Sequence, residues 1–104
     1  GHAYGQMILY PWGYQKNLSK DNNVYTSVCQ EMGRLANFKV FQCSHTWTAA
    51  PHYGYEMDWY YINGAFACVC EIGTQFIPPT TSIDPEVKRI YPAYLYFMEN
   101  AKIN

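Results

Sequence analysis

The stretch Gly1–Tyr14, GHAYGQMILYPWGY, carries the clearest strand signal in the chain together with an isolated histidine. Its centre, Gln6–Tyr10, is a short apolar run ended by Pro11 and Gly13, which are poorly tolerated inside a buried strand. The sequence therefore predicts a buried strand over Gln6–Tyr10. His2, just before it, has two interpretations. It is either a surface residue of a Gly-His cloning scar, or a ligand whose partners lie elsewhere in the chain.

Apolar spacing predicts one helix and two more strands after this first strand. Apolar residues recur at helical spacing over Asn22–Leu35, and an alternating pattern over Phe38–Gln42 predicts the second strand. The small, β-branched and apolar run Gly64–Ile72 predicts the third strand. Between these strands, Ser44–Asp58 is expected to be irregular. A loop of this length in a small domain is usually functional or disordered, and its aromatic residues argue against disorder.

The C-terminal part of the chain is expected to be a helix. Asp84 followed by Pro85 is typical of an N-cap and a first helical position. Apolar residues then recur at helical spacing to about Ala101. Pro92 lies inside this helix and is expected to kink it or to remove one backbone hydrogen bond.

The order of these elements predicts an α/β fold. Nearly continuous apolar strands indicate a sheet buried on both faces by helices. Two helices are too few to cover both faces of such a sheet. We therefore expect the body to be incomplete as given.

Composition restricts the function further. The chain has 104 residues, enough for at most one domain, and 18% of them are aromatic while only 14% are charged. Two explanations fit: a binding module with an aromatic face, or part of a larger domain that covers these rings. A net charge of −1 argues against a nucleic-acid partner. No apolar run approaches the roughly 20 residues that a membrane span requires.

The four cysteines do not form a zinc motif. Cys68 and Cys70 lie two residues apart in a predicted strand, so they share a face and are badly placed for a mutual disulfide. The sequence contains no Cys-x-x-Cys pair, and buried free thiols are the favoured interpretation. The redox compartment stays open.

Glu71 is the strongest candidate for chemistry. A carboxylate at the end of an apolar strand is only partly solvated, which suits a general base. The alternative is a structural Glu71 that reaches solvent or pairs with Arg34 or Arg89. His45 and His52 lie in the long irregular segment, where surface or hydrogen-bonding roles are commoner than metal ligation.

Taken in order, three motifs resemble the zinc metallocarboxypeptidases related to carboxypeptidase A. His2–Gln6 is similar to the family's His-Ser-Tyr-x-Gln, and Tyr10–Tyr14 matches its Tyr-Pro-aromatic-Gly-Tyr without a gap. Asp58–Gly64 is similar to Asp-Trp-x-Tyr-x-x-Gly. The family's catalytic glutamate then falls on Glu71, with one residue fewer in between.

This resemblance implies a carboxypeptidase-like α/β fold, in which the chain supplies part of a mixed β-sheet flanked by helices and is incomplete as given. Residues 1–104 would be the C-terminal part of a catalytic domain, with the remainder of that domain as partner. It implies Zn²⁺ as the cofactor, His2 as the last zinc ligand and Glu71 as the catalytic residue. The substrate contacts it implies are Ala3, Tyr4, Tyr53 and Met57.

The implied activity is hydrolysis of the C-terminal peptide bond of peptides or proteins. Met57, just before the Asp-Trp pair, implies a preference for apolar or aromatic C-terminal residues. The family's His-x-x-Glu ligands and its carboxylate-binding Arg and Asn lie upstream and are absent from these residues, so the chain alone is expected to be inactive. The resemblance also favours an extracellular location.

Two departures from the family pattern stand out. Ala3 replaces the usual Ser, and a gapless match puts Ala50 where the family has a mobile Tyr, a role that Tyr53 or Tyr55 would have to take.

Two other classes of function remain open. They are a non-enzymatic module that binds a peptide or carbohydrate on its aromatic surface, and a related zinc amidohydrolase.

Overall fold

A mixed β-sheet forms the centre of the computed structural model, which describes residues 1–46, 51 and 53–103. Within these residues the sheet has three strands, β1 (Met7–Tyr10), β2 (Lys39–Gln42) and β3 (Val69–Glu71), in the order β2-β1-β3. β1 runs parallel to β2 and antiparallel to β3. The predicted mixed sheet of an α/β fold is confirmed.

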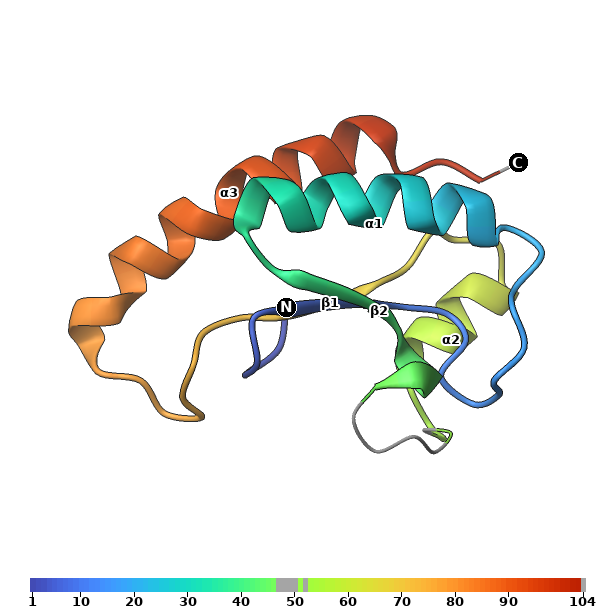
Figure 1. Cartoon of the computed structure of the whole chain (residues 1–104), viewed down its shortest axis with the longest axis horizontal. Coiled ribbons are helices and arrows are strands. Elements are labelled where there is room, and N and C mark those ends of the chain that lie inside the picture. The colour runs from blue at the N-terminus through green and yellow to red at the C-terminus, as the bar shows by residue number, and fades with distance from the viewer. Residues whose placement is uncertain (47–50, 52, 104) are drawn as a thin grey trace.

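Helices lie on both faces of this sheet. Helix α1 (Asn22–Ala36) and helix α3 (Ile83–Asn100) lie side by side over one face, and the short helix α2 (Glu56–Ile62) lies on the other side (Figure 1). None of the helices in the described part of the chain has the length and hydropathy of a membrane span.

Successive side chains of β1 point to opposite faces of the sheet and pack into different halves of the core. Ile8 is fully buried in a cluster with Tyr25 of α1 and Ile90 of α3. Leu9, the next residue, points to the opposite face and packs with Met57 of α2 and other buried side chains. Burying one such aliphatic side chain contributes roughly 1.5–3 kcal/mol, so β1 ties both helical layers to one strand.

Many of the aromatic residues belong to this core. The ring of Tyr25 is fully buried, with its centroid 4.3 Å from that of Phe66 and 5.2 Å from that of Tyr61. Burial raises the pKa of the Tyr25 phenol, whose oxygen accepts a hydrogen bond from the backbone N–H of Ala67 at 3.2 Å. The high tyrosine content therefore serves packing as well as the surface.

Helix α1 approaches β2 very closely at Gly33. A Cβ placed there would lie 2.8 Å from the carbonyl oxygen of Phe38 and would overlap the Val40 side chain. The helix ends in a left-handed residue, Asn37 (φ 56°), whose N–H bonds to the Gly33 carbonyl. Only glycine at position 33 allows the chain to turn back so tightly into β2.

Two of the predicted elements differ in the structure. The segment expected to be irregular contains a 3₁₀ turn over Cys43–His45 and helix α2, with Glu56 and Asp58 in the first turn of α2. Carboxylates at a helix N-terminus interact favourably with the helix dipole, but a helix of seven residues also needs tertiary contacts. The third strand is only Val69–Glu71, because it pairs with β1 over just three residues, Met7–Leu9.

Helix α3 also starts differently from the prediction. Asp84 is not its N-cap: the helix begins at Ile83 after Ser82, and a 3₁₀ turn over Thr80–Ser82 leads directly into it. The Ser82 hydroxyl donates to the Pro79 carbonyl, which stabilises this earlier start. Pro92 lies inside α3 as predicted, and the ribbon of α3 bends along its length (Figure 1).

Candidate active site

Strand pairing brings His2 and Glu71 together across 69 residues of sequence. The N–H of His2 donates to the Cys70 carbonyl at 2.8 Å, and the N–H of Ile72 donates to the His2 carbonyl at 2.7 Å. These two bonds form an isolated parallel bridge between His2 and Glu71. The His2 ring nitrogen Nδ1 consequently lies 3.1 Å from Oε2 of Glu71.

The two members of this pair differ in exposure. The His2 side chain is 68% exposed and the Glu71 side chain only 12% exposed, so the imidazole faces solvent while the carboxylate is enclosed. The structural alternative had Glu71 reach solvent or pair with Arg34 or Arg89. Arg34 instead binds Glu31 at 2.6 Å, and the ion pair of Glu71 in the described residues is with His2 and not with Arg89. Among the described residues, the side-chain partner of Glu71 is the His2 imidazole, at 3.1 Å.

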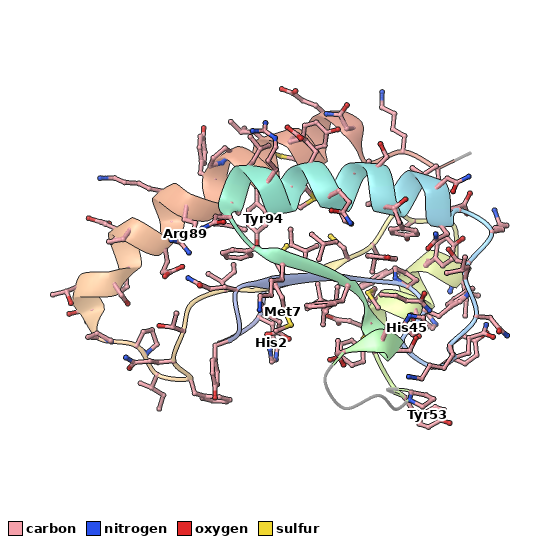
Figure 2. All side chains as sticks on the ribbon, in the orientation of Figure 1. His2, Met7, His45, Tyr53, Arg89 and Tyr94 are labelled. Carbon is pink, nitrogen blue, oxygen red and sulfur yellow. The ribbon has the colours of Figure 1, made fainter. Side chains whose placement is uncertain are left out.

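A cavity of about 350 Å³ opens beside the pair. The His2 side chain lies on the opposite side of the sheet from that of Tyr94 (Figure 2). The residues that line the cavity come from the N-terminal segment, from the segment before and within α2, and from β3 with the residue before it. They are Gly1, His2, Tyr53, Gly54, Tyr55, Glu56, Cys68, Val69 and Glu71. The cavity is large enough for a few substrate atoms and contains two carboxylates and two phenols.

The other implied substrate contacts lie in different places. Tyr53 lines the cavity and is 78% exposed. The Tyr4 ring is 49% exposed and lies edge-on to Phe76, with centroids 6.3 Å apart. Ala3 is half-buried and joins Tyr4 through a cis peptide bond.

Met57 lies behind the cavity wall. It is only 2% exposed and packs with Leu9 and Cys43 in the core, whereas its neighbour Glu56 lines the cavity. The side chains of the two residues therefore point in different directions along α2. A role for Met57 at the floor of a side-chain pocket stays a prediction.

The other histidines are accounted for differently. His45 lies in the 3₁₀ turn after β2, and its Nε2 is 2.9 Å from the backbone carbonyl of Lys16. His52 and Ala50 lie outside the residues that the structure describes. Tyr55 lines the cavity, and burial raises the pKa of its phenol, which therefore stays protonated at neutral pH.

Asp58 is the site-forming residue whose role the sequence did not reveal. It is buried, and both of its carboxylate oxygens accept hydrogen bonds from the N–H of Gly13 at 3.0 Å, while one also accepts from the N–H of Tyr14 at 3.0 Å. Asp58 thereby fastens α2 to the turn after β1. The sequence does contain a hint of this role: Asp58 and Gly13 belong to the two motifs Tyr10–Tyr14 and Asp58–Gly64, which occur together in the resemblance.

The donor chemistry of the pair suits zinc but does not complete a site. Zinc is bound in proteins by imidazole nitrogen and carboxylate oxygen, and a catalytic site needs three protein ligands. Across residues 1–46, 51 and 53–103, no group of three or more His, Cys, Asp or Glu side chains could hold a metal ion. A zinc site that included His2 would therefore need ligands from outside these residues.

Known proteins with a similar sequence and fold place this geometry in context. Carboxypeptidase A4 of Mus musculus is 26% identical over 110 residues, which cover 97% of this chain and 26% of the mouse protein. The crystal structure of thrombin activatable fibrinolysis inhibitor (TAFI) superposes with a TM-score of 0.88 at 20% identity, covering 96% of this chain and 27% of that one. The structure of bovine thrombin-activatable fibrinolysis inhibitor in complex with tick carboxypeptidase inhibitor superposes with a TM-score of 0.86 at 22% identity. The match covers 96% of this chain and 37% of the bovine one.

These similarities concern only part of each relative. The chain spans about a quarter of the length of the mouse protein, and the solved structures support the fold that the sheet order indicated. The family model for zinc carboxypeptidases matches residues 1–93, which include both His2 and Glu71. The chain therefore belongs to the zinc carboxypeptidase family.

Proposed function

We propose that this chain supplies the last metal ligand and the general base of a zinc-dependent carboxypeptidase that hydrolyses the C-terminal peptide bond of peptides or proteins. The observation that supports this most strongly is the 3.1 Å contact between His2 and Glu71 at the edge of a cavity. Membership of the zinc carboxypeptidase family supports the same assignment.

The residues of the chain have distinct tasks in this reaction. Bound zinc would supply Lewis-acid polarisation of the scissile carbonyl. His2, in its neutral form, would hold the metal through a ring nitrogen. Glu71 accepts a proton from the attacking water and delivers it to the departing amine. Enclosure of Glu71 limits its solvation and keeps the carboxylate directed at the cavity.

The chain on its own should bind zinc weakly and have no peptidase activity. One His and one Glu give too few ligands, and zinc affinity depends on a nearly complete set. Calorimetric titration of the 104-residue chain with zinc is the measurement. Submicromolar binding that disappears in the His52→Ala variant would contradict the proposal and would favour a local histidine site.

The genomic reading frame upstream of Gly1 offers a direct check of the missing ligands. A His-x-x-Glu motif followed by an Arg and an Asn-Arg pair favours the carboxypeptidase. A complete gene without them would favour the non-enzymatic aromatic module, or an enzyme that has lost its activity. Hydrolysis of amino-acid amides instead of C-terminal peptide bonds would favour a related zinc amidohydrolase.

His2→Ala should lower the metal content of the complete catalytic domain. Loss of a direct ligand is expected to weaken zinc binding by more than roughly 100-fold, because even outer-shell partners contribute 10–100-fold. Zinc per polypeptide, measured by plasma mass spectrometry after gel filtration, is the readout. His45→Ala is the matched control and should retain zinc, since His45 faces the Lys16 carbonyl. A His2→Ala variant that keeps its full zinc content would show that His2 is a surface residue and not a metal ligand.

We further propose a preference for large apolar C-terminal residues, set by Met57. A thioether packs well against a Phe or Leu side chain but cannot pair a buried cation, and burying an unpaired Lys costs several kcal/mol. Two peptides that differ only in a terminal Phe or Lys are to be compared by kcat/KM. The Phe peptide is expected to be the better substrate by at least roughly 10-fold.

The same experiment would give the opposite preference if Glu56 determined specificity. Its position in the cavity wall would let its carboxylate pair with a basic substrate. A Lys preference that is lost in Glu56→Gln would show that Glu56, and not Met57, determines specificity. The zinc and Glu71 chemistry would be unaffected by that result.

A further inference from the structure

Four sulfur-containing side chains line one cavity between helix α3 and the sheet. The cavity has a volume of about 340 Å³ and is bordered by Met32 of α1, by Cys70 of β3 and Cys68 just before it, and by Met98 of α3. Its other lining residues are Gly1, Tyr94 and Phe97, so none of the described residues around it carries a carboxylate or an imidazole. The cavity is therefore lined by soft and apolar groups.

The two thiols share this cavity because successive residues before and within β3 alternate between the faces of the sheet. Cys68 and Cys70 pack with the core cluster under α1 and α3, whereas Val69 between them packs with the cluster on the opposite face. Both cysteines are free. Two steps of extended chain separate their Cα atoms by roughly 6.5 Å, near the upper limit for a disulfide. A metal ion between the two sulfurs spans a wider gap, because each metal–thiolate bond is itself about 2.3 Å long.

The two thioethers differ in exposure. Met32 is 0% exposed and belongs to the same core cluster as Cys70, whereas Met98 is 70% exposed. A methionine side chain has three rotatable bonds, so the sulfur of Met98 can turn toward the thiols while α3 stays in place. Thiolate and thioether sulfur select Cu(I), whereas Ca²⁺ and Mg²⁺ require oxygen ligands and structural zinc sites use four Cys or His. The donor set of this cavity therefore fits a soft monovalent ion.

We propose that Cys68 and Cys70 bind Cu(I) as thiolates and that the thioether of Met98 completes a three-coordinate sulfur site, with Met32 as its buried wall. Each thiol releases its proton as its sulfur bonds to copper. The ion stays in the Cu(I) state, so binding needs no oxidant or reductant. Figure 2 shows Tyr94, which lines this cavity, on the side of the sheet opposite to His2. The copper site is thus distinct from the proposed zinc site.

The test is titration of the reduced, complete catalytic domain with Cu(I) in the absence of oxygen, in competition with the chelator bathocuproine disulfonate. The wild type should hold one Cu(I) per polypeptide. Cys68→Ser and Cys70→Ser should each weaken this binding by more than roughly 100-fold, because a direct ligand contributes more than the 10–100-fold of an outer-shell partner. Cys43→Ser is the matched control and should bind as the wild type does, since Cys43 packs with Leu9 and Met57 on the opposite face of the sheet.

Met98→Leu gives a readout that does not depend on the cysteines. It keeps the apolar volume of an exposed side chain, so the fold is retained, and it should weaken Cu(I) binding by roughly 10-fold. Copper K-edge absorption of the wild-type complex should show sulfur atoms alone in the first coordination shell.

Zinc is counted in the same samples, because Cys68 also borders the cavity of His2 and Glu71. The zinc content should stay unchanged when copper binds. Nitrogen or oxygen ligands on copper, loss of zinc on addition of copper, or weakened binding in Cys43→Ser would overturn the proposal. Unchanged affinity in Cys70→Ser or in Met98→Leu would overturn it as well.

Discussion

Replacement of Glu71 by Gln is expected to lower kcat for a peptide substrate by roughly 10²–10⁴-fold in a polypeptide that carries this chain together with the upstream ligands. The amide has nearly the same shape as the carboxylate but cannot accept a proton from water. The enclosed position of Glu71 beside His2 means that no bulk water molecule replaces it easily as a base. Steady-state release of the C-terminal amino acid measures the effect.

The Glu71→Gln variant should keep its zinc, because Glu71 is not assigned as a ligand. Glu99→Gln is the matched control: Glu99 is exposed on α3, and the same substitution there should leave kcat unchanged within about two-fold. Near-normal hydrolysis by a zinc-loaded Glu71→Gln variant would show that Glu71 has a structural role only.

Replacement of Asp58 by Ala is expected to lower the free energy of unfolding by roughly 2–5 kcal/mol. The substitution leaves the buried N–H of Gly13 and the N–H of Tyr14 without their carboxylate acceptor, and each lost charged bond costs about 1.5–3 kcal/mol. Asp58→Asn keeps one acceptor oxygen and should lose about half as much. Denaturant unfolding at neutral pH, followed by tryptophan fluorescence, gives these values.

Asp84→Ala is the control for the Asp58 series. Asp84 is exposed in the first turn of α3, where its interaction with the helix dipole contributes at most about 1 kcal/mol. An Asp58→Ala loss no larger than that of Asp84→Ala would mean that the turn after β1 is held by other contacts.

Helix α1 and the positions of the strands could be predicted from local pattern. In α1, β1 and β2, the apolar residues are spaced so that they lie on the buried face of each element. Helix α2 could not, since a helix of seven residues is marginal on its own and depends on tertiary contacts. Those contacts are the burial of Met57 and the hydrogen bonds that Asp58 accepts from the N–H of Gly13, which lies 45 positions away in the sequence.

The candidate site was predictable only in part. Local pattern singled out His2 before an apolar strand and Glu71 at the end of one, but their paired roles came from the resemblance of ordered motifs and not from any local metal-binding spacing. Their contact depends on pairing between the N-terminal segment and β3, which single-residue patterns do not encode. Met57 is buried while its neighbour Glu56 lines the cavity, because successive residues of helix α2 point in different directions, and the local pattern did not predict this helix. The role of Met57 in a side-chain pocket stays a prediction.

Zinc-edge anomalous diffraction from crystals of the complete catalytic domain tests the central claim, that His2 is a metal ligand beside the base Glu71. A single strong peak is expected about 2.0–2.1 Å from a ring nitrogen of His2, with the Glu71 carboxylate close by but outside bonding distance. A zinc peak elsewhere in the domain, or an empty position beside His2 in zinc-loaded crystals, would contradict the account.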